Sequence, residues 1–75
     1  MKIAIMGSGG VGGYLGARLV QKDHDVTFVA RGAHLAAMQV NGLRLDDKTH
    51  PALINPIKAT DNPSEIGPVD LVIFS

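Results

Sequence analysis

The sequence predicts an α/β fold with a doubly wound, mostly parallel sheet, of which these 75 residues supply the N-terminal portion. Three features indicate this class: an apolar run at residues 3–6 that leads into a glycine-rich turn, a helical pattern at residues 10–22, and a β-branched run at residues 26–30. A strand, a tight turn, a helix and a strand within about 30 residues make one βαβ unit, and its crossover is expected to be right-handed.

The composition is that of a folded domain without a strong charge preference. Hydrophobic residues make up 45% and charged residues 19%, and seven Lys plus Arg balance seven Asp plus Glu. This balance argues against recruitment by nucleic acid or an anionic membrane. The chain has no cysteine, which agrees with a reducing, cytoplasmic setting. The apolar run after Lys2 stops at Gly7, too early for a signal peptide, and no segment is predicted to cross a membrane.

The first strand and helix have clear patterns. Residues 3–6 are apolar without alternation, which is typical of a central parallel strand covered on both faces. In residues 10–22, Val11, Leu15 and Leu19 recur at helical spacing and form one apolar face. We therefore expect the first strand to be buried and the helix to pack on it.

The segments after the second strand are less regular. Residues 34–40 predict a short helix that ends at Asn41 and Gly42. The alternation in residues 43–45 predicts a strand, and residues 52–60, interrupted by Pro56, would return as its partner in an irregular β-hairpin. Residues 61–66 support one or two helical turns, and residues 69–74 form a strongly apolar strand.

The last strand ends one residue before the chain does. In an open doubly wound sheet this strand lies beside the first, and a ligand crevice opens where the two diverge. With nothing after Ser75 to cover it, the strand would present an apolar edge that favours self-association. We therefore expect residues 1–75 to be a truncated N-terminal nucleotide-binding domain.

The glycine-rich turn indicates a Rossmann-type dinucleotide site, because the pattern G-x-G-x-x-G stands between a strand and a helix. Gly7 would permit the tight turn, Gly9 the approach of the pyrophosphate, and Gly12 close packing of helix and strand. Gly13 and Gly16 are attributed to helix packing. The alternative is a glycine-rich turn without a ligand. The residues expected to bind the phosphates are Gly7, Ser8, Gly9, Gly10, Val11 and Gly12.

The end of the second strand distinguishes the two nicotinamide dinucleotides. An NAD site usually places an acid about 20 residues past the glycines, to bind the ribose 2′-hydroxyl, whereas a basic residue accommodates a 2′-phosphate. Here the residues are Ala30 and Arg31. A guanidinium can bind a phosphate through two hydrogen bonds, so NADP is favoured over NAD. The alternative is that Arg31 only ends a strand in water.

The histidines and paired acids give weaker signals. His34 lies one turn beyond Arg31, near enough to approach the adenosine phosphate, but a solvated histidine at a helix start is the simpler interpretation. His24 and His50 have no partner at metal-ligand spacing, so no metal site is expected. Turn formation and helix capping account for Asp46, Asp47 and Asp61 without acid/base chemistry.

Four segments together resemble the N-terminal domain of the ketopantoate reductases (2-dehydropantoate 2-reductases): residues 2–13, Ala30-Arg31-Gly32, Asn41-Gly42-Leu43 and Gly67-Pro68-Val69-Asp70-Leu71-Val72. The resemblance implies a cytoplasmic enzyme of pantothenate and coenzyme A biosynthesis that reduces a small 2-oxo acid, 2-dehydropantoate, to pantoate with NADPH. It also implies a Rossmann domain followed by a C-terminal helical domain, with the active site between them. Asp23 departs from the glycine that relatives often carry, but aspartate tolerates the left-handed region.

Carried over by position, residues 7–12 would form the phosphate loop and Arg31 would hold the 2′-phosphate. In the family a cofactor-contacting lysine follows the last strand seen here, and the catalytic lysine and glutamate belong to the helical domain. We therefore expect no catalytic residue within residues 1–75 and no turnover by this chain alone. A stand-alone nucleotide-binding module and an inactive gene fragment stay open as alternatives.

Overall fold

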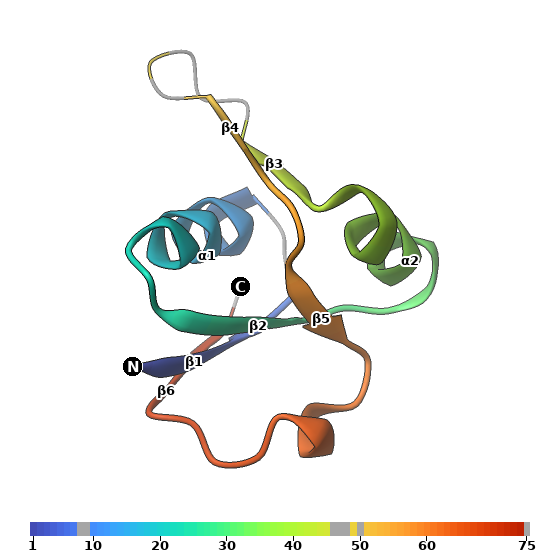
Figure 1. Cartoon of the computed structure of the whole chain (residues 1–75). Coiled ribbons are helices and arrows are strands. Elements are labelled where there is room, and N and C mark those ends of the chain that lie inside the picture. Colours follow the sequence, from blue (N-terminus) through green and yellow to red (C-terminus); the bar gives the residue numbers. More distant parts are fainter. Residues whose placement is uncertain (8–9, 46–48, 50, 75) are drawn as a thin grey trace.

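The structure is a computed structural model that describes residues 1–7, 10–45, 49 and 51–74. Strands and helices alternate from the N-terminus, as Figure 1 shows. The elements are β1 (Lys2–Met6), α1 (Gly10–Gln21), β2 (Asp25–Val29), α2 (Gly32–Asn41), β3 (Leu43–Leu45), β4 (Ala52–Ile54), β5 (Lys58–Thr60), the 3-10 helix η1 (Pro63–Glu65) and β6 (Leu71–Phe74). None of the described helices is long and apolar enough to cross a bilayer.

The main sheet is parallel and has the strand order β5-β2-β1-β6. β1 lies between β2 and β6, so the last strand is beside the first, as the sequence predicts. The predicted α/β class with a parallel, Rossmann-type sheet is confirmed. Both α-helices lie on one side of the sheet (Figure 1), which leaves its other face without an α-helix in the described part of the chain.

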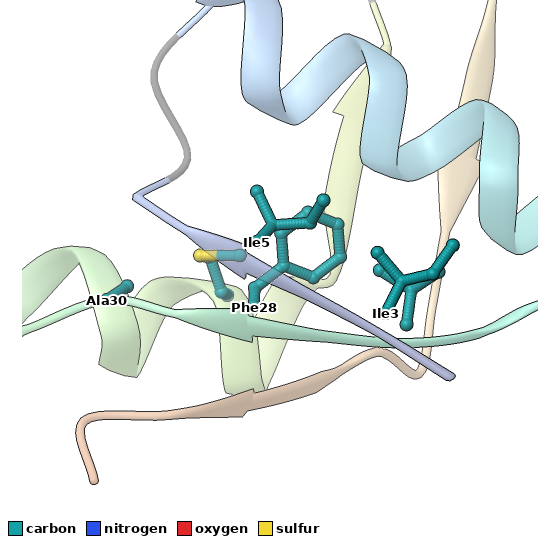
Figure 2. Close-up of a cluster of buried hydrophobic side chains, with 6 residues drawn as sticks. Ile3, Ile5, Phe28 and Ala30 are labelled. Carbon is teal, nitrogen blue, oxygen red and sulfur yellow. The ribbon is translucent and has the colours of Figure 1, made fainter. Parts of the chain in front are cut away.

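The core fills the space between the sheet and the two helices. Register places Ile5 of β1 beside Phe28 of β2, and both side chains are fully buried. Figure 2 shows the buried cluster, which consists of Ile3, Ile5, Val26, Phe28, Ala30 and Met38. The burial that the apolar patterns of the first two strands predict is therefore confirmed.

The turn from α1 into β2 confirms the expectation for Asp23. Its φ of 66° lies in the left-handed region, which aspartate enters more easily than most side chains. The backbone N–H of Asp23 donates to the carbonyl of Val20, and that of His24 donates to the carbonyl of Leu19. These bonds satisfy carbonyl groups at the end of the helix.

α2 ends as the sequence predicts. Gly42 has a φ of 78°, and its backbone N–H donates to the carbonyl of Met38 at 2.9 Å. A β-carbon at position 42 would also meet the carbonyl oxygen of Ile54, so the turn requires glycine for two reasons. The helix begins at Gly32 rather than at residue 34.

The interpretation of residues 52–60 as a single hairpin strand is only half right. β3 and β4 do form an antiparallel pair, with Leu43 opposite Ile54. Residues 58–60, however, leave the hairpin and join the main sheet as β5, parallel to β2. Pro56 has no N–H to donate to a ladder, which ends the antiparallel pairing, and Ala59 then packs against the core beside Phe28.

η1 and β6 complete the fold. The Asn62 side chain accepts a hydrogen bond from the backbone N–H of Ser64, so the predicted helical segment is one 3-10 turn with a side-chain cap. β6 is an edge strand, and three of its apolar side chains are exposed: 44% for Leu71, 42% for Val72 and 79% for Phe74. Ile73 instead packs against the core. The predicted apolar edge is therefore present.

Candidate nucleotide-binding site

The glycine-rich turn leaves the sheet at the carboxyl end of β1. Gly7 has a φ of 90°, which L side chains rarely adopt, and its backbone N–H donates to the carbonyl of Val29 at 3.0 Å. Ser8 and Gly9 lie outside the described residues. Gly10, Val11 and Gly12 form the first turn of α1, where unpaired backbone N–H groups favour an anion.

A crevice of about 350 Å³ opens beside Gly7. It lies at the carboxyl ends of β1 and β2, where open α/β sheets bind their ligands. The backbone N–H of Ala30 donates to the carbonyl of Thr60 at 3.0 Å, which ties the β2 end of this crevice to β5. Its lining residues are Met6, Gly7, Val29, Ala30, Arg31 and His34.

Arg31 supplies positive charge to this crevice. It is the residue before α2, its backbone is extended (φ −137°, ψ 158°), and its side chain is exposed. Of the described residues that line the crevice none is acidic, and the first turn of α2 has no acid either. The structure thus brings Gly7 and Arg31 together, as the sequence predicts. An acid that would repel a 2′-phosphate is not among these lining residues.

His34 lies at the start of α2, as the sequence predicts. Its side chain is exposed, in agreement with the solvated interpretation, but it also lines the same crevice as Arg31. The available signal was the short spacing of three residues between Arg31 and His34 at the start of α2. His24 lies at the other end of β2, and His50 is outside the described residues. The described residues contain no cluster suited to a metal ion.

Close helix packing is clearest at Gly16. A β-carbon there would lie 2.5 Å from Cε1 of Phe28 and 3.3 Å from Cγ1 of Ile5. Helix α1 can therefore approach β1 and β2 only because position 16 has no side chain. This confirms the expectation for Gly16, whereas the packing role given to Gly12 stays a prediction.

A larger hollow of about 490 Å³ involves the amino ends of β2 and β5, away from the glycine turn. Two of its charged groups form an ion pair, with Lys58 Nζ 2.5 Å from Asp25 Oδ1, and a third, Glu65, accepts a hydrogen bond from the Thr60 hydroxyl at 2.7 Å. The hydrogen bond from Lys58, together with its positive charge, lowers the pKa of Asp25. We therefore interpret this hollow as a solvated region that contains an ion pair, and not as the nucleotide site.

Comparison with known proteins agrees with this geometry. The family model described as "Ketopantoate reductase PanE/ApbA" matches residues 3–75. The chain belongs to the ketopantoate reductase family. Ketopantoate reductases are nucleotide-dependent oxidoreductases, so a glycine-rich turn at the carboxyl edge of the sheet is in keeping with membership.

Two curated relatives match along the whole chain. A 2-dehydropantoate 2-reductase of Mesorhizobium japonicum is 43% identical over 76 residues, and the oxidoreductase YkpB of Bacillus subtilis is 35% identical over 75 residues. In both cases the match covers 100% of this chain but only 23% and 24% of the relative. The chain thus spans about a quarter of the length of these ketopantoate reductase relatives.

Solved ketopantoate reductase structures share the fold. A 2-dehydropantoate 2-reductase from Geobacter metallireducens superposes with a TM-score of 0.93 at 36% identity, covering 100% of this chain and 25% of that protein. A PanE/ApbA family ketopantoate reductase from Ralstonia eutropha gives 0.87 at 39% identity, covering 99% and 24%. The strand order and helix positions described above are therefore those of this family's N-terminal region.

Proposed function

We propose that this chain is the NADPH-binding portion of a 2-dehydropantoate 2-reductase, an enzyme that reduces ketopantoate to pantoate. The observation that carries the proposal is that Gly7 and Arg31 line one crevice at the carboxyl edge of β1 and β2. The names of the relatives support the reaction, and the basic residue supports the phosphorylated cofactor.

The described residues fit a dinucleotide. The turn at Gly7 and the start of α1 offer backbone N–H groups to a pyrophosphate, and Arg31 offers a planar pair of donors to a 2′-phosphate. The proposed set is Gly7, Ser8, Gly9, Gly10, Val11, Gly12 and Arg31. When bound, the reduced nicotinamide would supply the hydride that converts the ketone to an alcohol.

The remaining chemistry is assigned to other parts of the protein. Reduction of a ketone needs groups that orient the substrate, polarise its carbonyl and deliver a proton. We propose that residues 1–75 are the N-terminal part of a two-domain architecture in which a C-terminal helical domain carries these groups. The relatives, of which the chain covers 23–24%, have room for such a domain. The proposal includes a cytoplasmic location and a small 2-oxo acid substrate, as the family resemblance implies.

The exposed edge of the sheet supports a further part of the proposal. β6 pairs with β1 along one edge, and its other edge has no partner strand in the described part of the chain. Val72 and Phe74 on this strand are exposed. An apolar strand at a sheet edge is a template for pairing with another strand. We propose that the 75-residue chain in isolation associates with a second copy through β6.

Binding and turnover separate this function from the alternatives. The purified 75-residue chain is titrated into NADPH while the fluorescence of the reduced nicotinamide is followed, and ketopantoate is then added. We expect saturable NADPH binding without ketopantoate reduction. Absence of NADPH binding would favour an inactive fragment, and turnover by this chain would contradict the assignment of catalysis to another domain.

A further inference from the structure

His34 and Arg31 face the same crevice from one end of α2. Arg31 precedes the helix and His34 is the third residue within it, so the two lie one turn apart. Both residues line the crevice beside Gly7. Gly32 and Ala33 stand between them in sequence, and neither has a side chain long enough to reach across the crevice.

The surroundings of His34 favour an anion. Of the described residues lining the crevice, Met6, Val29 and Ala30 are apolar, and Arg31 carries a positive charge. The amino end of α2 adds the positive end of a helix dipole. β5 also packs against α2, but its Lys58 lies at the far end of the strand and is paired with Asp25.

We propose that the imidazole of His34 is a second contact for the 2′-phosphate of the cofactor, beside Arg31, and that this contact makes the preference for NADPH over NADH depend on pH. This inference rests on the proposed cofactor site. An imidazolium ring donates two hydrogen bonds and carries charge, whereas a neutral ring donates one. Two cations on a phosphate dianion bind it more tightly than Arg31 alone.

The direction of the pH effect follows from this chemistry. Histidine changes charge near neutral pH, and a phosphate monoester takes up its second proton at about pH 6. Between pH 6.5 and pH 8.5 the phosphate is therefore mainly a dianion, whereas an imidazolium donor gives up its positive charge. NADPH affinity is expected to fall as pH rises through this window, and NADH affinity is expected to stay level because NADH has no 2′-phosphate.

The test measures NADPH and NADH dissociation constants at pH 6.5, 7.5 and 8.5 for the 75-residue chain, His34→Gln and the control His24→Gln. His24 lies at the opposite end of β2 from the crevice, so its replacement matches the chemistry without touching the site. The wild type and the control are expected to lose about threefold to tenfold NADPH affinity across the window. The His34→Gln chain is expected to bind NADPH with the same low affinity at all three pH values. This affinity should match that of the wild type only at pH 8.5.

A second measurement needs no substitution. The ring-proton NMR signals of His34 should move when 2′,5′-ADP is added and stay in place when ADP is added. Unchanged His34 signals, or a His34→Gln profile identical to the wild type in a chain that still prefers NADPH, overturn the role of His34 alone. A wild-type chain that binds neither dinucleotide overturns the cofactor site and this inference together.

Discussion

Gly16 of α1 lies so close to Phe28 of β2 that a β-carbon at position 16 would be 2.5 Å from the ring atom Cε1. The ring is fully buried, so it has no free space into which to move. This contact fixes the height of α1 above the sheet, and with it the position of the helix start that follows the glycine-rich turn.

The substitution Gly16→Ala has two opposite effects on the stability of the fold. Alanine favours a helix over glycine by about 1 kcal/mol, but overpacking a buried contact costs about 1–3 kcal/mol. We expect the clash to dominate and the free energy of unfolding in urea to fall. Adding Phe28→Leu should make the Gly16→Ala step less costly than it is in the wild type. A Gly16→Ala chain more stable than the wild type would contradict the close contact.

Gly7→Ala is expected to lower both stability and NADPH affinity. A side chain at a positive φ costs about 1–2 kcal/mol, and relief of this strain would move the turn that faces the crevice. Gly67→Ala is the matched control, because Gly67 also has a positive φ (75°) but lies near Lys2 at the opposite end of β1. Urea unfolding should show a loss in both variants. Fluorescence titration should show weaker NADPH binding in Gly7→Ala alone.

The pair between Lys58 and Asp25 predicts a small acid sensitivity. Because the pKa of Asp25 is lowered in the folded chain, the ionised carboxylate stabilises the fold above the ordinary aspartate pKa. That contribution is lost as pH falls through the lowered value. Stability curves of the wild type and Lys58→Met should therefore converge as pH drops from about 5 to below 4. A difference that stays constant over this range would show that the pair contributes no pH-dependent stability.

The exposed edge of β6 predicts that two copies of the chain associate, and that a charged residue on this strand prevents the association. Lysine on an edge strand discourages pairing with a further strand. In sedimentation velocity, the isolated wild-type chain should show concentration-dependent dimers, and Val72→Lys should be monomeric. Val40→Lys is the control, since Val40 is 74% exposed on α2, away from the edge. If both lysine variants behaved like the wild type, β6 would not be the interface.

The sequence indicated most of the sheet because β1, β2 and β6 are apolar runs whose neighbours are set by the doubly wound topology. β5 was predicted as a strand but assigned to the wrong sheet, because Lys58, Ala59 and Thr60 form a short and largely polar stretch whose pairing with β2 is not visible in its pattern. Periodicity could not decide whether His34 faces the crevice, because that depends on how α2 packs on the sheet. The tight contact at Gly16 likewise depends on the buried position of Phe28.

The central claim is that Arg31 selects a 2′-phosphorylated dinucleotide, and the ratio of the NADH and NADPH dissociation constants tests it most directly. The ratio is measured for the wild type, for Arg31→Ala and for Arg44→Ala, a control that removes an exposed arginine from β3. Arg31→Ala is expected to weaken NADPH binding by about tenfold or more while NADH binding stays unchanged, and Arg44→Ala should alter neither. An unchanged ratio in Arg31→Ala would contradict the account.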